Sequence, residues 1–222
     1  MINIAIDGPA GAGKSTLAKG LAEKLGFIYV DTGALYRTVG LKFSNLSANA
    51  DDDAEVEKVL SKTEIDLKFI DGVQCVFLDG ENVNDKIRTP KASMMASKVS
   101  AKPKVRAFLL NMQRKIAQDN NAIMDGRDIG TVVLPNADIK IFLTADNKIR
   151  AKRRYEELIQ KGEKVEYDDV LRDLEQRDYN DSHREIAPLK PAKDSILFDT
   201  TNYNLEQSVN ELYKIINERL VK

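Results

Sequence analysis

Residues 2–17 have the sequence INIAIDGPAGAGKSTL, and the order of its three parts is informative. Ile2–Ile6 is an apolar run that predicts a short buried strand. Residues 8–15, GPAGAGKS, match the pattern G-x-x-x-x-G-K-[ST] in full. Apolar residues at helical spacing follow as far as Leu25, and Gly26 is expected to end that helix. A strand, a glycine-rich loop and a helix in this order predict a loop whose backbone amides surround an anion.

The chemistry of this loop points to a nucleotide. Its glycines let the backbone fold around phosphate groups, and the N-terminus of the helix adds partial positive charge. Lys14 is predicted to reach the β- and γ-phosphates, and Ser15 to coordinate Mg²⁺. The alternative interpretation is an ordinary glycine-rich turn between a strand and a helix. GTPase switches, motor ATPases and small-molecule kinases share the motif, so the rest of the chain has to distinguish among them.

The composition predicts a single globular domain, since the chain has 222 residues and is 42% hydrophobic. Its 34 Lys and Arg nearly balance 35 Asp and Glu, which argues against binding to nucleic-acid polymers or to a membrane surface. Cys75 is the only cysteine, which excludes an intrachain disulfide. No apolar run approaches the ~20 residues that span a bilayer, and no secretory signal is evident. We expect a cytoplasmic protein that acts as a monomer.

Strands alternate with helices along most of the chain. We expect strands at 2–6, 27–30, 122–124, 138–143 and 196–198, and helices at 14–25, 32–43, 51–60, 90–118 (interrupted near residue 103), 147–160, 167–181 and 205–220. This order predicts an α/β fold with a parallel sheet covered by helices on both faces. Residues 63–88 differ, because apolar and polar residues alternate on both sides of Asp71-Gly72. That pattern predicts a small antiparallel hairpin inserted into the domain.

A kinase needs a second anion site facing the loop, together with cations for the transferred charge. Five arginines are candidates: Arg37, Arg106, Arg127, Arg177 and Arg184. Arg127 follows the strand that ends at Asp125, and ligands bind at the carboxyl ends of parallel strands. Arg177 and Arg184 are predicted to share one helix face, being seven residues apart. Asp125 is placed to orient Mg²⁺. The alternatives are solvated surface arginines and, for Asp125, a plain Asp-Gly turn.

A basic cluster at 150–154, RAKRR, lies on the helix predicted at 147–160. One interpretation is a solvated helix face, on which Glu156 and Glu157 balance the charge. The other is a mobile lid whose arginines close over the transferred phosphoryl group, where an arginine is worth ~10³–10⁵ in rate in related chemistry.

Several motifs occur in a fixed order along the chain. They are GPAGAGKST (8–16), DTGALYR (31–37), the hairpin insertion, ASKVSAKPKVR (96–106), DGRDIGT (125–131), RAKRR (150–154) and RDYNDSHREIAPL (177–189). This set resembles the bacterial-type cytidylate kinases nearly end to end, and DGRDIGT and the last stretch are its most specific parts. The resemblance implies a P-loop nucleoside monophosphate kinase fold with a small antiparallel insertion and a helical lid. The implied reaction is ATP with CMP or dCMP giving ADP with CDP or dCDP, with Mg²⁺.

The resemblance also implies roles for individual residues. ATP would be bound by Gly8, Pro9, Ala10, Gly11, Ala12, Gly13, Lys14, Ser15 and Thr16, with Mg²⁺ at Ser15 and Asp125. The cytosine would contact Ser97, Arg106 and Asp128; the ribose Arg177 and Asp181; the acceptor phosphate Arg37, Arg127 and Arg184, with Thr32 nearby. The catalytic set would be Lys14, Arg127, Arg153, Arg154 and Arg184, with Arg153 and Arg154 in the lid. The implied regions are a core at about 1–40 and 104–222, a nucleoside monophosphate-binding insertion at about 63–103, and a lid at about 147–183.

Two alternatives remain open. A kinase of the same fold could act on UMP, AMP or shikimate, and a P-loop switch would hold or hydrolyse its nucleotide without a phosphate acceptor. The second arginine site argues against a switch. No general base is needed, because a phosphate monoester has a second pKa of ~6 and is ionised at neutral pH. The single histidine, His183, is accordingly expected to be an exposed helix residue.

Overall fold

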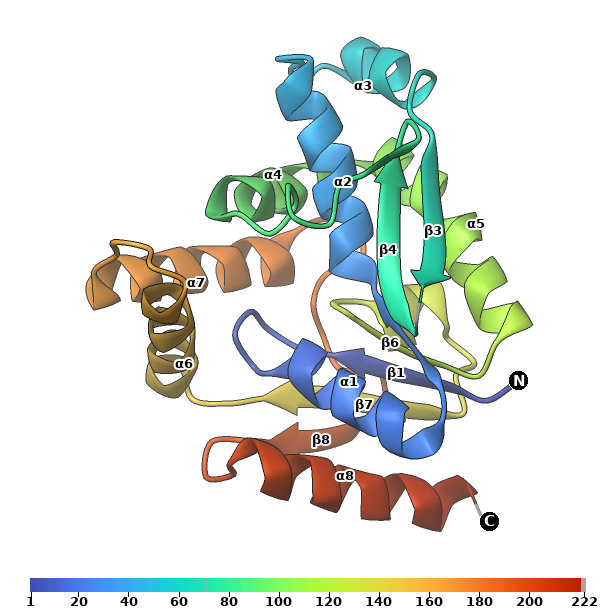
Figure 1. The fold of residues 1–222 in the computed structure, drawn as a ribbon, viewed down its shortest axis with the longest axis vertical. Helices are drawn as coiled ribbons and strands as arrows, with labels where there is room; N and C mark the ends of the chain where they lie inside the picture. The colour runs from blue at the N-terminus through green and yellow to red at the C-terminus, as the bar shows by residue number, and fades with distance from the viewer. Residues whose placement is uncertain (71, 221–222) are drawn as a thin grey trace.

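The computed structural model describes residues 1–70 and 72–220, which form two sheets with helices around them (Figure 1). The parallel five-stranded sheet has the order β2-β6-β1-β7-β8, and the antiparallel three-stranded sheet the order β3-β4-β5. The strands are β1 (Asn3–Asp7), β2 (Ile28–Asp31), β3 (Ile65–Ile70), β4 (Val73–Leu78), β5 (Glu81–Asn82), β6 (Ala122–Gly126), β7 (Ile139–Thr144) and β8 (Ile196–Asp199). The helices are α1 (Lys14–Leu25), α2 (Thr32–Asn45), α3 (Asp53–Leu60), α4 (Pro90–Ser100), α5 (Pro103–Asp119), α6 (Asn147–Gln160), α7 (Tyr167–His183) and α8 (Leu205–Leu220), with a π-helix η1 (Ile129–Val133).

This architecture confirms the predicted α/β fold with its antiparallel insertion. The break between α4 and α5 falls where it was expected, because Pro103 takes the first helical position, where its missing N–H costs nothing. The strand predicted at 122–124 is longer and continues to Gly126. The π-helix η1 was not predicted, since its sequence IGTVV is apolar without a helical period.

The parallel sheet is buried on both faces because its strands are apolar at successive positions. Ile4 and Ile6 of β1 pack in one cluster with residues of α1 and α8. Ala5 packs on the opposite face with Met124 of β6 and with Ala117 of α5. In Figure 1, α1 and α8 accordingly lie together on one side of the sheet. The central position of β1 places the loop that follows it in the middle of the sheet edge.

The antiparallel insertion has a core of its own. Val76 and Leu78 of β4 pack with Leu35 and Phe43 of α2 and with other buried residues of α3, α4 and α5. The predicted turn lies between the paired residues Ile70 and Val73; Gly72 has φ +76°, and Asp71 lies outside the described residues. The two strands of the predicted hairpin and their antiparallel pairing are therefore confirmed.

A large cavity lies at the carboxyl ends of β1, β2 and β6. Its volume is about 2280 Å³, and its walls come from the loop after β1, the insertion, α4 and the helix pair α6 and α7. Within residues 1–70 and 72–220, no helix is both long enough and apolar enough to cross a membrane.

Candidate active site

The glycine-rich loop of residues 8–13, hereafter the P-loop, connects β1 to α1 at the floor of the cavity. Gly8 has φ +151°, and a Cβ there would lie 2.0 Å from the backbone oxygen of Leu143, so no other residue fits. Gly13, with φ +85°, is the N-cap of α1 and provides no side-chain cap. The first N–H groups of α1 therefore have no side-chain acceptor from that residue, which is the arrangement that binds phosphate.

Lys14 begins α1 and is 6% exposed. Its Nζ donates a hydrogen bond to the backbone oxygen of Pro9 at 2.7 Å, so the ammonium folds back over the loop. Burial, and then the nearby Arg127 guanidinium, lower the pKa of Lys14 to about 7. In the described part of the chain this carbonyl is the one hydrogen-bond partner of the ammonium, so a bound anion would restore solvation that the ammonium loses on burial.

Asp125 lies at the end of β6 directly beside the P-loop helix. Ser15 donates from Oγ to Asp125 Oδ2 at 2.7 Å, and Tyr29 donates from its hydroxyl to Oδ1 at 3.1 Å. Thr32 donates from Oγ1 to the backbone oxygen of Asp125 at 2.7 Å. Burial, followed by the charge of Asp31, raises the pKa of the Asp125 carboxyl to about 6.

This corner fits a magnesium ion that also uses substrate oxygens. Mg²⁺ prefers oxygen ligands and is commonly held by one or two carboxylates together with phosphates, and Ser15 and Asp125 supply a hydroxyl and a carboxylate in contact. No group of three or more His, Cys, Asp or Glu residues able to hold a metal occurs in the described part of the chain, so an all-protein cage is not offered there.

A second cluster forms around Asp128, two residues beyond β6. Its carboxylate pairs with Arg106 of α5 through Oδ2 and with Arg184 at 3.3 Å through Oδ1. All three side chains are less than 10% exposed. Ser97 of α4 also lines the cavity. Three segments far apart in the sequence thus present donors and an acceptor side by side.

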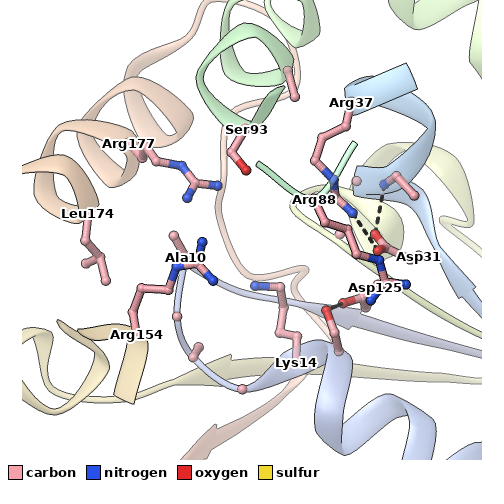
Figure 2. Close-up of a pocket in the computed structure, with 18 of the residues that line it drawn as sticks. Ala10, Lys14, Asp31, Arg37, Arg88, Ser93, Asp125, Arg154, Leu174 and Arg177 are labelled. Atoms are coloured by element: carbon pink, nitrogen blue, oxygen red, sulfur yellow. Dashed lines mark hydrogen bonds and ion pairs between the residues drawn. The ribbon is translucent and has the colours of Figure 1, made fainter. Parts of the chain in front are cut away.

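The remaining predicted arginines line the same cavity, and Figure 2 shows two of them, Arg37 and Arg177, above the P-loop. Arg127 donates to Asp181 at 2.8 Å, and Arg37 donates to Asp31 at 2.7 Å. Arg177 makes no hydrogen bond or ion pair with any described residue, and its buried Nε has no partner. Burial and then the charge of Arg127 lower the pKa of Arg177 to about 10. The Arg177 guanidinium therefore has donors available for a ligand in the cavity.

The lid arginines differ from one another in their surroundings. Arg154 pairs with Glu157 at 2.7 Å and points toward the P-loop in Figure 2. Arg153 instead donates to the hydroxyl and the backbone oxygen of Thr200, at 3.1 and 2.8 Å, at the edge of the cavity. Arg184 does not share a helix with Arg177 as predicted, because α7 ends at His183 and Arg184 has the extended ψ of 141°. His183 is exposed, as expected.

Some residues that line or support the cavity were not singled out from the sequence. Arg88 lines the cavity from the segment after β5 (Figure 2), and as a lone arginine in an irregular stretch it gives no local signal in the sequence. Tyr29, the partner of Asp125, looks in the sequence like any strand residue. Arg150 and Asp178 lie within quoted motifs, but their motifs do not reveal their partners.

Comparison with known proteins places the chain in one family. The family model described as cytidylate kinase matches residues 4–218. A cytidylate kinase of Caldicellulosiruptor bescii is 52% identical over 223 residues, which cover 99% of both chains. One of Thermosipho africanus is 48% identical over 97% of this chain and 95% of its own. A crystal structure of an uncharacterized protein from Eubacterium ventriosum, 15% identical, has the same fold with a TM-score of 0.55 over 98% of this chain and 99% of that one. The protein belongs to the cytidylate kinase family.

Proposed function

We propose that this protein transfers the γ-phosphoryl group of ATP, with Mg²⁺, to CMP and dCMP, giving ADP and CDP or dCDP. The observation that carries the proposal is that two anion-binding regions face each other across one cavity (Figure 2). Figure 2 shows Lys14 beside the P-loop, with Arg37 and Arg177 across the cavity from it, and Arg127 also lines the cavity. Phosphoryl transfer between two nucleotides needs this arrangement, because both phosphate chains must be held end to end.

On the donor side, residues 8–16 bind the phosphates of ATP through backbone N–H groups and Lys14. The hydrogen bond from Lys14 to Pro9 is exchanged for one to a phosphate oxygen, which removes the cost of burying the ammonium. Ser15 and Asp125 hold the Mg²⁺, which when bound neutralises charge on the β- and γ-phosphates. Arg153 and Arg154 belong to the lid that excludes water.

On the acceptor side, the base is read by Asp128, Arg106 and Ser97. The carboxylate accepts from the exocyclic amine of cytosine, and arginine and serine donate to the ring carbonyl and N3. Uracil presents a carbonyl where cytosine has the amine, so a buried carboxylate disfavours it. Arg177 and Asp181 hold the ribose. Arg37, Arg127 and Arg184, with Thr32 nearby, hold the phosphate and orient it in line with ATP.

The proposal also assigns regions. The insertion at about 63–103 contributes to acceptor binding, and the lid at about 147–183 closes over the donor, around a core at about 1–40 and 104–222. Gln74 of β4 connects the insertion to this site, because it accepts from the backbone N–H of Asp31 at 2.7 Å and donates to its oxygen at 3.2 Å. The enzyme acts as a cytoplasmic monomer on free nucleotides, without a nucleic-acid polymer or membrane.

A screen of acceptors tests the proposal. ADP release is measured with ATP and Mg²⁺ in the presence of CMP, dCMP, UMP, AMP or shikimate, and without acceptor. We expect turnover with CMP and dCMP, weak turnover with UMP, and none with AMP or shikimate. A preference for another acceptor would assign a different substrate to the same fold. Hydrolysis of ATP that no acceptor stimulates would indicate a switch instead.

A further inference from the structure

Arg150 is the buried member of the basic cluster at 150–154, with a side chain only 3% exposed. Each of its guanidinium nitrogens has a protein acceptor. Nε donates to the backbone oxygen of Ala145 at 3.0 Å, one terminal nitrogen donates to the backbone oxygen of Ala10 and to Asp178 Oδ2, both at 2.6 Å, and the other donates to Asn147 Oδ1. A guanidinium committed in this way has little capacity left for a ligand, so its role is to hold other groups in place.

Asp178 completes the arrangement. While its Oδ2 accepts from Arg150, its Oδ1 accepts from the backbone N–H of Ala10 at 3.1 Å. The N–H and the C=O of the same P-loop residue are therefore held by two side chains that form an ion pair with each other. The next residue, Gly11, is equally enclosed: a Cβ there would lie 3.1 Å from Leu174 Cδ1 and 3.3 Å from Arg150 Cβ.

The pair also connects the P-loop to the lid. Arg150 lies in the first turn of α6, and Asp178 lies near the end of α7, so they occupy the base of the helix pair that forms the proposed lid. Figure 2 shows Ala10 lying between Lys14 and the lid side chains Arg154 and Leu174.

We propose that Arg150 and Asp178 are positioning residues that hold the P-loop in its phosphate-binding shape before ATP arrives and anchor it to the base of the lid. A loop that is already ordered loses less conformational entropy when its ligand binds, so the pair contributes to ATP affinity without touching ATP. This inference rests on the proposed use of the P-loop as the ATP site, and it assigns neither residue to the acceptor.

The experiment uses Asp178→Asn, which keeps the shape of the side chain and removes its charge, and Arg150→Lys, which keeps the charge and cannot reach all the acceptors of Arg150 at once. Asp194→Asn is the matched control, because Asp194 pairs at 2.8 Å with the buried Lys140 and neither residue lines the cavity. The measurements are KM for ATP and for CMP, the dissociation constant of a fluorescent ATP analogue without acceptor, and Tm.

We expect both variants to raise KM for ATP and the dissociation constant of the analogue about tenfold or more, since small displacements of a positioning group have effects up to about 100-fold. KM for CMP should stay near the wild-type value, and Asp194→Asn should alter none of these constants. Variants with a lower Tm and normal ATP binding would overturn the proposal, as would an equal rise of KM for both substrates. The dissociation constant of the analogue is measured without acceptor. It therefore tests the role of Arg150 and Asp178 even if the acceptor is not CMP.

The wild-type protein supplies a test that does not depend on folding of a variant. Hydrogen exchange of the Ala10 amide should be slow in the absence of nucleotide, because Asp178 accepts from it. Rapid exchange of this amide beside a protected β1 would show that the loop is not held, and would refute the proposal.

Discussion

Replacing Arg177 by glutamine is expected to make the protein more stable and the enzyme less active. Arg177 forms no ion pair with any described residue, and burial together with Arg127 lowers its pKa from 12.5 to about 10. The lowered pKa means that the folded protein disfavours the charged form, which is still the form present at pH 7. A buried, unpaired arginine of this kind lowers the stability of the folded protein, and we infer that its presence serves ligand binding.

The size of the stability effect follows from the pKa. The difference between 12.5 and about 10 corresponds to about 3 kcal/mol as an upper limit, and solvent screening in the open cavity reduces this to about 1 kcal/mol. For a chain of this size, 1 kcal/mol raises Tm by about 2–4 °C. Loss of the charged hydrogen bonds to the acceptor, worth about 1.5–3 kcal/mol, should lower kcat/KM for CMP about 10- to 150-fold.

The assay pairs thermal unfolding without ligands with steady-state kinetics in which CMP is varied at saturating ATP. Arg172→Gln is the control, because Arg172 is on the same helix, has a 70% exposed side chain and pairs with Asp169. It should alter neither Tm nor KM. If Arg177→Gln instead lowers Tm by several degrees and leaves kcat/KM for CMP unchanged, then Arg177 is a structural residue and the proposed acceptor site is wrong.

Three further predictions concern residues around the cavity. Lys14→Ala should lower kcat by about 100-fold or more with little loss of Tm, because among the described residues the buried ammonium bonds to Pro9 alone; unchanged turnover would exclude the assigned role. Asp128→Ala should reduce the ratio of kcat/KM for CMP to that for UMP, a ratio that does not depend on the folded fraction, whereas an unaltered ratio would mean that the base is read elsewhere. Burial raises the pKa of Asp7 from 3.8 to about 6, so the folded protein binds this proton more readily than the unfolded chain. As pH rises from 4 to 7, the free energy of unfolding should therefore fall by up to about 3 kcal/mol through this group. Urea unfolding measured at several pH values should show a smaller fall for Asp7→Asn than for the wild type. An equal fall in the two proteins would contradict this prediction.

Local signals in the sequence predicted most of the helices and strands and the position of the P-loop between β1 and α1. The P-loop is specified by residues adjacent in the chain, because its glycines, its lysine and the helix start act within one short segment. The hairpin and the break at Pro103 were predictable for the same reason, since turn chemistry and the missing N–H of proline act within a few residues. The π-helix η1 was missed because no local period marks it.

The partners of the charged residues were decided by the tertiary structure alone. Arg150 and Arg153 look alike in the sequence, yet one is buried against the P-loop and the other is bound to Thr200. Arg177 forms no ion pair with any residue that the structure describes, while Arg184, beyond the end of α7, pairs with Asp128. Each of these outcomes depends on which distant segments meet at the sheet edge. Whether a charged side chain is buried or paired depends on these contacts between distant segments. The free-energy cost of an unpaired charge therefore arises only when the folded chain buries it.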